Sequence, residues 1–212
     1  MSHADFLAKL SEKLDAFPQW NLDQLDGKSA RIFTIDMNKG FTRTGALSSP
    51  RVAALLPATR NFLKACREKD LFIAAVTDCH TPDSAELASY PAHCLDDTEE
   101  PELAPEIWEF PRKILTKNST NAFFAPGMDK LLQNAQVVVI TGCCTDICIA
   151  QFAVTLKAFA NQSDLPLDVV VPRQLVDTYD APGHPAQLLH DLALLSMAEN
   201  GVRVVNYQPT KQ

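Results

Sequence analysis

The sequence has little of what several large classes of protein require. No apolar run approaches the roughly 20 residues that a membrane-spanning helix needs, so a membrane protein is not expected. The 19 basic residues are outnumbered by 26 acidic ones, and the net charge is −7. Because nucleic-acid binding depends on clustered lysine and arginine, a nucleic-acid partner is not expected either. No G-x-G-x-x-G motif follows the first predicted strand, which argues against a dinucleotide site. Small molecules are the expected partners.

The cysteines lack the spacings that are typical of redox motifs and zinc ribbons. None of them forms a C-x2-C pair. We therefore expect reduced thiols in a soluble, cytoplasmic protein. The six residues concerned are Cys66, Cys79, Cys94, Cys143, Cys144 and Cys148.

Residues 1–28 are expected to form an amphipathic helix and a lead-in to a single domain over residues 29–212. Apolar side chains recur at helical intervals with acidic residues between them, a pattern unlike a signal or transit peptide. They are Phe6, Leu7, Leu10, Leu14 and Phe17. The chain has 212 residues, 46% of them hydrophobic, which is enough for one sizeable domain.

Strand-like and helix-like segments alternate along the rest of the chain. Predicted strands cover Arg31–Ile35, Leu71–Thr77, Lys113–Thr116, Val137–Thr141, Leu167–Val171 and Val202–Val205. Predicted helices cover Val52–Lys69, Met128–Asn134, Asp146–Ala160 and Pro185–Asn200. Strands separated by helices need crossover connections. The sequence therefore predicts an α/β fold with a doubly wound, mostly parallel six-stranded sheet and helices on both faces.

Reactive side chains follow four of the predicted strands. In doubly wound sheets ligands bind beyond the carboxyl ends of the strands, where these side chains would meet. The positions are Asp36, Asp78, Lys117 and the loop Gly142–Cys148. Each one alone is most often a solvated cap. Together they supply a proton acceptor, a cation and a nucleophile, the parts of an activated covalent catalyst.

Cys148 is the candidate nucleophile. Gly142 ends a buried strand and Thr145 can cap the helix that follows, so Cys148 is expected in the first helical turn. The helix dipole and a nearby lysine would lower the pKa of its thiol, and backbone N–H groups would stabilise an oxyanion. Two alternatives stay open: Cys148 is a buried structural cysteine, or Cys144 is the nucleophile because the helix begins earlier.

A segment of roughly thirty residues without periodicity follows Asp78, and such segments are usually functional. It brings two imidazoles and two carboxylates into one region: Asp78, His80, Glu86 and His93. A mixed nitrogen and oxygen set suits Zn, Mn or Fe better than Ca or Mg. The alternative is that both histidines are ordinary surface residues of a loop.

Several of these motifs together resemble a known family. They are the run Ile35–Phe41, Asp78-x-His80, Tyr90-Pro-x-His93-Cys94, Lys117 and Gly142-x-x-Thr145-Asp-x-Cys148. In order and spacing they are similar to the nicotinamidase branch of the isochorismatase-like cysteine hydrolases, and they span residues 31–207. The resemblance implies the isochorismatase-like hydrolase fold.

The resemblance also implies roles for particular residues. The catalytic triad would be Asp36, Lys117 and Cys148. The metal ligands would be Asp78, His80 and His93, with Glu86 at the place of a fourth ligand that some members use. A cis peptide would join Cys143 to Cys144, and the N–H groups of Cys144 and Cys148 would form the oxyanion hole. Phe41 and Tyr90 would enclose the substrate ring, although Phe41 also fits ordinary core packing.

The implied reaction converts nicotinamide, or a close carboxamide such as pyrazinamide, to the carboxylic acid and ammonia through a cysteine thioester. This is a step of NAD salvage. One divalent ion, zinc before manganese or iron, would orient the ring. Tyr90, Cys144 and Ile147 depart from the residues usual at their positions, which leaves the preferred carboxamide open. Family members often assemble, so a homo-oligomer is expected.

Two other functions stay open. A metal-free relative would act on another small substrate, as an isochorismatase-like vinyl-ether hydrolase or an N-carbamoyl amidohydrolase; Asp78, His80 and His93 argue against it. An inactive binding member of the same fold is the third hypothesis. The intact set of Asp36, Lys117 and Cys148 argues against that reading.

Overall fold

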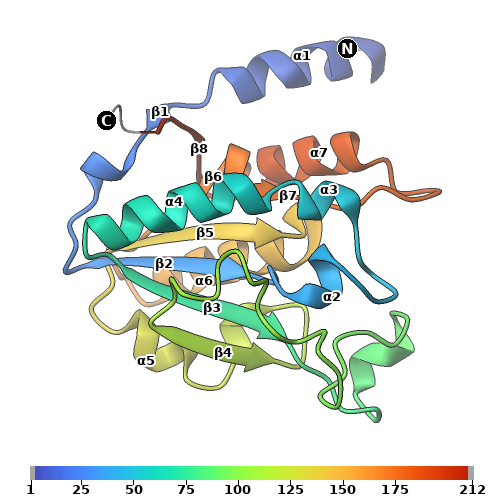
Figure 1. Ribbon diagram of the computed structural model, residues 1–212. Coiled ribbons are helices and arrows are strands. Elements are labelled where there is room, and N and C mark those ends of the chain that lie inside the picture. Colours follow the sequence, from blue (N-terminus) through green and yellow to red (C-terminus); the bar gives the residue numbers. More distant parts are fainter. Residues whose placement is uncertain (1–2, 210–212) are drawn as a thin grey trace.

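The computed structural model describes residues 3–209 and places one parallel β-sheet between two layers of helices (Figure 1). The eight strands are β1 (Gln19–Trp20), β2 (Ala30–Ile35), β3 (Phe72–Asp78), β4 (Lys113–Lys117), β5 (Val137–Cys143), β6 (Asp168–Pro172), β7 (Val176–Asp177) and β8 (Arg203–Tyr207). Their order is β1-β8-β6-β5-β2-β3-β4, with β7 also pairing with β5. The predicted doubly wound fold is therefore confirmed.

The predicted number of six strands is too low. All six predicted strands are present, and β1 and β7 are additional. Each of these has two residues, which is too short to give a periodic signal in the sequence. β1 extends the sheet beyond β8, and β7 pairs with the end of β5.

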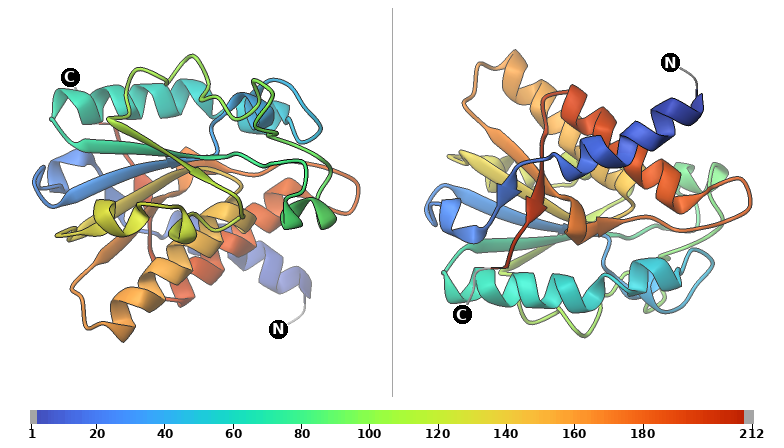
Figure 2. Two further views of the ribbon diagram at one scale, coloured as in Figure 1. Left: turned by 90° about the horizontal axis from the view of Figure 1, so that it is seen from below. Right: turned by 90° about the horizontal axis from the view of Figure 1, so that it is seen from above.

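Helices cover both faces of the sheet, as Figure 2 shows. The α-helices are α1 (His3–Asp15), α2 (Lys39–Thr42), α3 (Pro50–Ala53), α4 (Leu56–Glu68), α5 (Met128–Leu132), α6 (Ala150–Gln162) and α7 (Ala186–Glu199). Alternate residues of β2 point to the two layers, because successive side chains of a strand leave opposite faces. Phe33 and Ile35 pack with α6 and α7, whereas Ile32 packs with α4.

The helix predicted over Val52–Lys69 is divided in two. α3 ends at Ala53 and α4 begins at Leu56, with a turn between them. Pro57 explains the division, because it has no N–H to donate to the carbonyl of Ala53. The predicted long helix is therefore wrong at this point.

The predicted N-terminal helix is present and packs on its own chain. α1 lies over α7 (Figures 1 and 2), and its Leu10 and Leu14 side chains are buried in the core. Leu7 is 48% exposed on the outer side. Across residues 3–209, every helix falls short of the length and apolarity that crossing a membrane would need.

The carboxyl ends of β5, β2, β3 and β4 lie side by side at one edge of the sheet. Gly142 makes the close approach of β5 to β2 possible there. Its φ is +113°, and a Cβ at this position would lie 2.0 Å from the carbonyl oxygen of Ile35. Any other residue would need the backbone to move, so the chain leaves these strands in a way that only glycine permits.

Candidate active site

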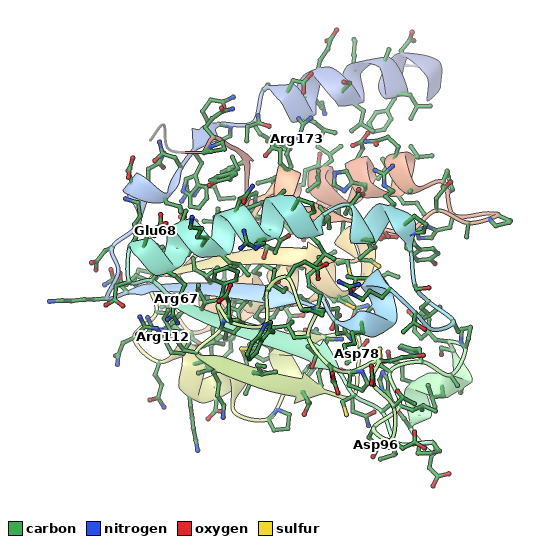
Figure 3. All side chains as sticks on the ribbon, viewed as in Figure 1. Arg67, Glu68, Asp78, Asp96, Arg112 and Arg173 are labelled. Carbon is green, nitrogen blue, oxygen red and sulfur yellow. The ribbon has the colours of Figure 1, made fainter. Side chains whose placement is uncertain are left out.

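A cavity of about 280 Å³ opens at the carboxyl edge of the sheet. Asp36, which directly follows β2, lines it together with Asp78 at the end of β3 and Cys148 beyond β5. Figure 3 labels Asp78 at this edge, away from Arg67 and Arg112 at the opposite one. The strand ends that the sequence singled out therefore meet in one place.

Lys117 connects the acidic groups to the thiol. Its Nζ lies 2.9 Å from Asp36 Oδ2 and 3.8 Å from Cys148 Sγ, and it also forms an ion pair with Asp78 Oδ1. Asp78 and Lys117 are register partners on β3 and β4, which explains why they meet. Lys117 is only 2% exposed, so its charge is neutralised by these neighbours rather than by water.

The two carboxylates titrate in opposite directions. Burial, reinforced by the negative charge of Asp78, raises the pKa of Asp36 to about 7, although Lys117 and a hydrogen bond from Cys148 oppose the shift. Burial would also raise the pKa of Asp78, but the positive charge of Lys117 opposes it, and this pKa is held well below its usual range. Asp36 is therefore suited to take up a proton near neutral pH, and Asp78 is suited to stay charged.

The expected lowering of the Cys148 thiol pKa is wrong. Burial raises this pKa well above the ordinary value; Lys117 lowers it, and Asp36 and Asp78 raise it further. The ammonium does not compensate for the burial of a thiol beside two carboxylates. The resting group is a thiol, and it needs a base when it reacts.

The turn that carries Cys148 is a π-helical turn, Thr145–Ile149, which continues into α6. The expected cap by Thr145 is wrong: this residue is already helical, and its Oγ1 lies 2.9 Å from His190 Nδ1. The Cys143–Cys144 peptide is cis, as the resemblance implies. Cys144 and Cys148 both line the cavity, so both thiols named as candidates reach it.

The four candidate metal ligands form one group. One ligand atom from each of them lies within 4.8 Å of the others. His80 Nε2 is 3.8 Å from Asp78 Oδ1 and 3.9 Å from Glu86 Oε1, and His93 Nε2 is 3.7 Å from Asp78 Oδ2. These separations exceed a hydrogen bond, but ligand atoms that share one zinc ion at about 2 Å lie roughly 3–4 Å apart.

Hydrogen bonds leave one nitrogen of each histidine free to face this group. His80 Nδ1 lies 2.7 Å from Asn118 Oδ1, and His93 Nδ1 lies 2.8 Å from the Pro91 carbonyl. Both acceptors take a proton from Nδ1, which leaves a lone pair on Nε2. His80 Nε2 is buried and has no hydrogen-bond partner within the described residues. An unpaired lone pair among carboxylates fits a divalent ion.

Aromatic and aliphatic side chains form much of the cavity wall. Phe41, on α2, and Tyr90, which follows the 3₁₀ turn Ala85–Ala88, both line it. Their ring centroids are 5.7 and 6.1 Å from that of His93. Ile147 lines the cavity beside Cys148. These side chains give the cavity an aromatic and aliphatic wall beside the candidate metal ligands.

Sequence reasoning missed several residues of the site. Asn118 follows Lys117 directly after a predicted strand. Its position at a strand end is the signal that could have identified it, as it did for Asp36 and Asp78. Ser84 Oγ donates to Asn118 Oδ1 at 2.7 Å, but it has no pattern in the sequence. Tyr179 lines the cavity after β7, a strand that was not predicted. The rim segment Leu47–Pro50 is also part of the wall.

Known proteins resemble this chain in sequence and in fold. Nicotinamidase 1 of Arabidopsis thaliana is 26% identical over 210 residues, covering 84% of this chain and 86% of that protein. The pyrazinamidase of Pyrococcus horikoshii, solved in complex with zinc, superposes with a TM-score of 0.68 at 21% identity, covering 84% of this chain and 99% of that one. N-carbamoylsarcosine amidase from Thermoplasma acidophilum superposes with a TM-score of 0.68 at 22% identity, covering 84% of this chain and 96% of that one.

At 21% and 22% sequence identity, these two solved structures show only that the fold is shared. The family assignment depends instead on a sequence match, because the isochorismatase domain matches residues 30–208. This range contains the whole sheet from β2 to β8 and every residue of the cavity described above. The protein therefore belongs to the isochorismatase family and is an isochorismatase-like hydrolase.

Proposed function

We propose that the protein hydrolyses nicotinamide, or a close carboxamide such as pyrazinamide, to the carboxylic acid and ammonia. The observation that carries the proposal is the contact of Lys117 with both Asp36 and Cys148 at a cavity that also holds the Asp78, His80, Glu86 and His93 group. The proposed nucleophile, Cys148, and its base, Asp36, thus lie next to candidate metal ligands whose ion would orient the substrate ring. The relationship to nicotinamidase 1 supports the same substrate class.

The first step is attack of Cys148 on the carboxamide carbon. Asp36 accepts the thiol proton as the C–S bond forms, which its pKa of about 7 allows near neutral pH. Lys117 stabilises the negative charge that develops on sulfur. The carbonyl oxygen becomes an oxyanion, and the backbone N–H groups of Cys144 and Cys148 are proposed to donate hydrogen bonds to it.

The second half of the reaction regenerates the thiol. Collapse of the tetrahedral intermediate breaks the C–N bond, and the proton held by Asp36 leaves with ammonia. Asp36 then removes a proton from a water molecule that attacks the thioester. Breaking the C–S bond releases the carboxylic acid, and the proton returns to Cys148. One water is consumed for each amide, so atoms and charge balance.

Asp78, His80, Glu86 and His93 would hold one divalent ion, zinc first because two imidazoles accompany the carboxylates. When bound, the ion supplies a Lewis acid for the ring nitrogen of the substrate. The protein residues do the rest: Phe41 and Tyr90, which line the cavity, orient the ring. His80 and His93 are held ready by their Nδ1 hydrogen bonds.

A metal-free amidohydrolase of the N-carbamoyl class is the second candidate, favoured only by the fold shared with N-carbamoylsarcosine amidase. The unpaired Nε2 of buried His80 argues against it, because a buried imidazole nitrogen without a partner is costly unless a ligand binds it. An inactive binding protein would not need the Lys117 contacts.

The location and the assembly of the protein stay predictions. A cytoplasmic location fits the unpaired thiols of all six cysteines. A homo-oligomeric assembly is also expected.

The experiment compares ammonia release from nicotinamide by three cysteine variants. Cys148→Ala removes the nucleophile, so turnover should fall by about 10⁴-fold or more while metal content is unchanged. Cys144→Ala keeps its backbone N–H and should retain turnover within about tenfold. Cys66→Ala, buried on α4 away from the cavity, is the control. Activity that survives in Cys148→Ala but disappears in Cys144→Ala would transfer the nucleophile role to Cys144.

A further inference from the structure

Tyr179 is an aromatic residue of the cavity rim with an unusual support. It lies in the loop between β7 and α7 and lines the cavity with Asp180 and Ala181. Its ring stacks on His184, with the centroids 3.9 Å apart and the planes inclined by 10°. Because His184 covers one face of the phenol ring, the cavity meets its other face or its edge.

The turn that carries the nucleophile holds the plane of His184. His184 Nε2 lies 2.8 Å from Asp146 Oδ2, and Asp146 is two residues before Cys148. His184 Nδ1 lies 3.0 Å from the Tyr179 carbonyl oxygen. Whichever ring nitrogen carries the proton, it faces one of these two acceptors, so the imidazole cannot rotate without losing that hydrogen bond. The position of the Tyr179 ring is thus tied to the position of Cys148.

The loop itself is braced at both ends. Ala181 N donates to His184 O at 3.2 Å and His184 N donates to Ala181 O at 2.8 Å, which closes a four-residue turn through Pro182 and Gly183. Gly183 has φ +81°, which is the conformation that a type II turn needs after proline. Ala186 N, the first amide of α7, donates to Asp180 Oδ1 at 3.0 Å. In Figures 1 and 2 this loop projects past the carboxyl ends of the strands.

Tyr179 also lies near the reacting groups. Burial raises the pKa of the Tyr179 phenol, and the charges of Cys144 and Asp146 raise it further. Burial likewise raises the pKa of Tyr90, with smaller effects from Cys148, Glu86 and Tyr179. The two phenols line the same cavity. Tyr179 therefore adds an aromatic wall to those of Phe41 and Tyr90.

We propose that Tyr179 determines specificity by stacking against the flat ring of an aromatic carboxamide, and that His184 and Asp146 are the residues that position it. The part concerning turnover rests on the proposed function, whereas the part concerning ring binding does not. A ring that lies on a pre-positioned aromatic side chain loses little conformational freedom on binding. An acyclic amide such as propionamide gains nothing from this wall.

The test uses steady-state ammonia release by the metal-loaded protein. Tyr179→Ala should raise KM for nicotinamide about tenfold and change kcat by less than about threefold, since the stacking is present in both ground and transition states. Tyr179→Phe should restore the wild-type KM. His184→Ala should raise KM by about threefold in the wild-type background and have no further effect in Tyr179→Ala. Additive effects of the two changes would overturn the positioning role of His184.

A binding measurement separates this inference from the proposed reaction. Calorimetric titration of nicotinamide into metal-loaded Cys148→Ala, with and without Tyr179→Ala, should give dissociation constants that differ about tenfold. Propionamide should bind both proteins equally weakly. If wild-type protein releases no ammonia yet this tenfold difference is found, the proposed function fails and the role of Tyr179 stands. Equal affinity in both backgrounds, or no nicotinamide binding in either, overturns the role of Tyr179.

Discussion

Lys117 explains much of the chemistry at the scale of single residues. Its buried ammonium contacts Asp36 and Asp78 and lies 3.8 Å from the Cys148 thiol. Without this cation, two carboxylates would face each other in an enclosed site, which costs several kcal/mol. Lys117 therefore holds the charged groups together, while the pKa of Asp36, raised to about 7, suits this carboxylate to accept a proton.

Asn118 gives a residue-scale prediction for the candidate metal site. Asn118→Ala removes the acceptor that holds His80 Nδ1, so metal affinity should fall about tenfold, the lower end of the range for such supporting residues, because Ser84 Oγ lies 3.3 Å from the same nitrogen. Asn161→Ala, exposed at the end of α6, is the matched control. Zinc affinity would be measured by competition with a chelator. Unchanged zinc affinity in Asn118→Ala would contradict the supporting role.

The sequence predicts those residues of the candidate site whose reactive side chains lie at the ends of strands. Asp36, Asp78, Lys117 and Cys148 follow four adjacent strands, and parallel strands place such residues together. The thiol pKa was predicted wrongly, because the sequence does not reveal how completely Cys148 is buried. Tyr179 was missed because its position depends on a two-residue strand and a turn, neither of which has a periodic pattern.

At the scale of elements, the approach of β5 to β2 sets the geometry of the turn that carries Cys148. Gly142→Ala would place a methyl group 2.0 Å from the Ile35 carbonyl in a backbone conformation with φ +113°. We expect a loss of about 4 kcal/mol or more in the free energy of unfolding, measured by urea denaturation. The distortion should reach Cys148, so turnover should fall as well.

Gly183→Ala is the control for this change. Gly183 has φ +81°, and a Cβ there would meet nothing within 4 Å. The substitution should therefore lower the free energy of unfolding only through backbone strain, by about 1–2 kcal/mol. If Gly142→Ala were no more destabilising than Gly183→Ala, the claim that β5 approaches β2 closely at Gly142 would be contradicted.

The elements that were predicted well are those whose pattern is long. Six strands and the helices α1, α6 and α7 have enough residues to show periodicity. The division between α3 and α4 depends on one missing N–H at Pro57, and the π-helical start of the nucleophile helix depends on contacts such as Thr145 with His190. Such local features depend on tertiary packing more than on sequence pattern.

At the scale of the whole molecule, α1 belongs to the folded core although it precedes the matched family domain. Leu10 is 3% exposed and packs in the cluster that also contains α6 and α7 residues, whereas Leu7 is 48% exposed. Leu10→Ala should lower the free energy of unfolding by about 2–5 kcal/mol. Leu7→Ala should change it by no more than about 0.5 kcal/mol.

Thermal and urea denaturation would measure both leucine variants, and nicotinamide turnover below the melting transition should be the same in each. An equal, small effect of Leu10→Ala and Leu7→Ala would mean that α1 does not pack on α7 as described. A loss of turnover without a loss of stability in Leu10→Ala would connect α1 to the cavity, which the contacts of α1 do not suggest.

Ammonia release from nicotinamide, with metal content determined on the same purified sample before and after chelation, tests the central claim most directly. The account predicts turnover with about one zinc, manganese or iron ion per chain, loss of turnover as the ion is removed, and recovery when zinc is returned. Turnover that is undiminished in metal-free protein would contradict the role of Asp78, His80, Glu86 and His93. No ammonia from nicotinamide or pyrazinamide by fully loaded protein would contradict the proposed reaction.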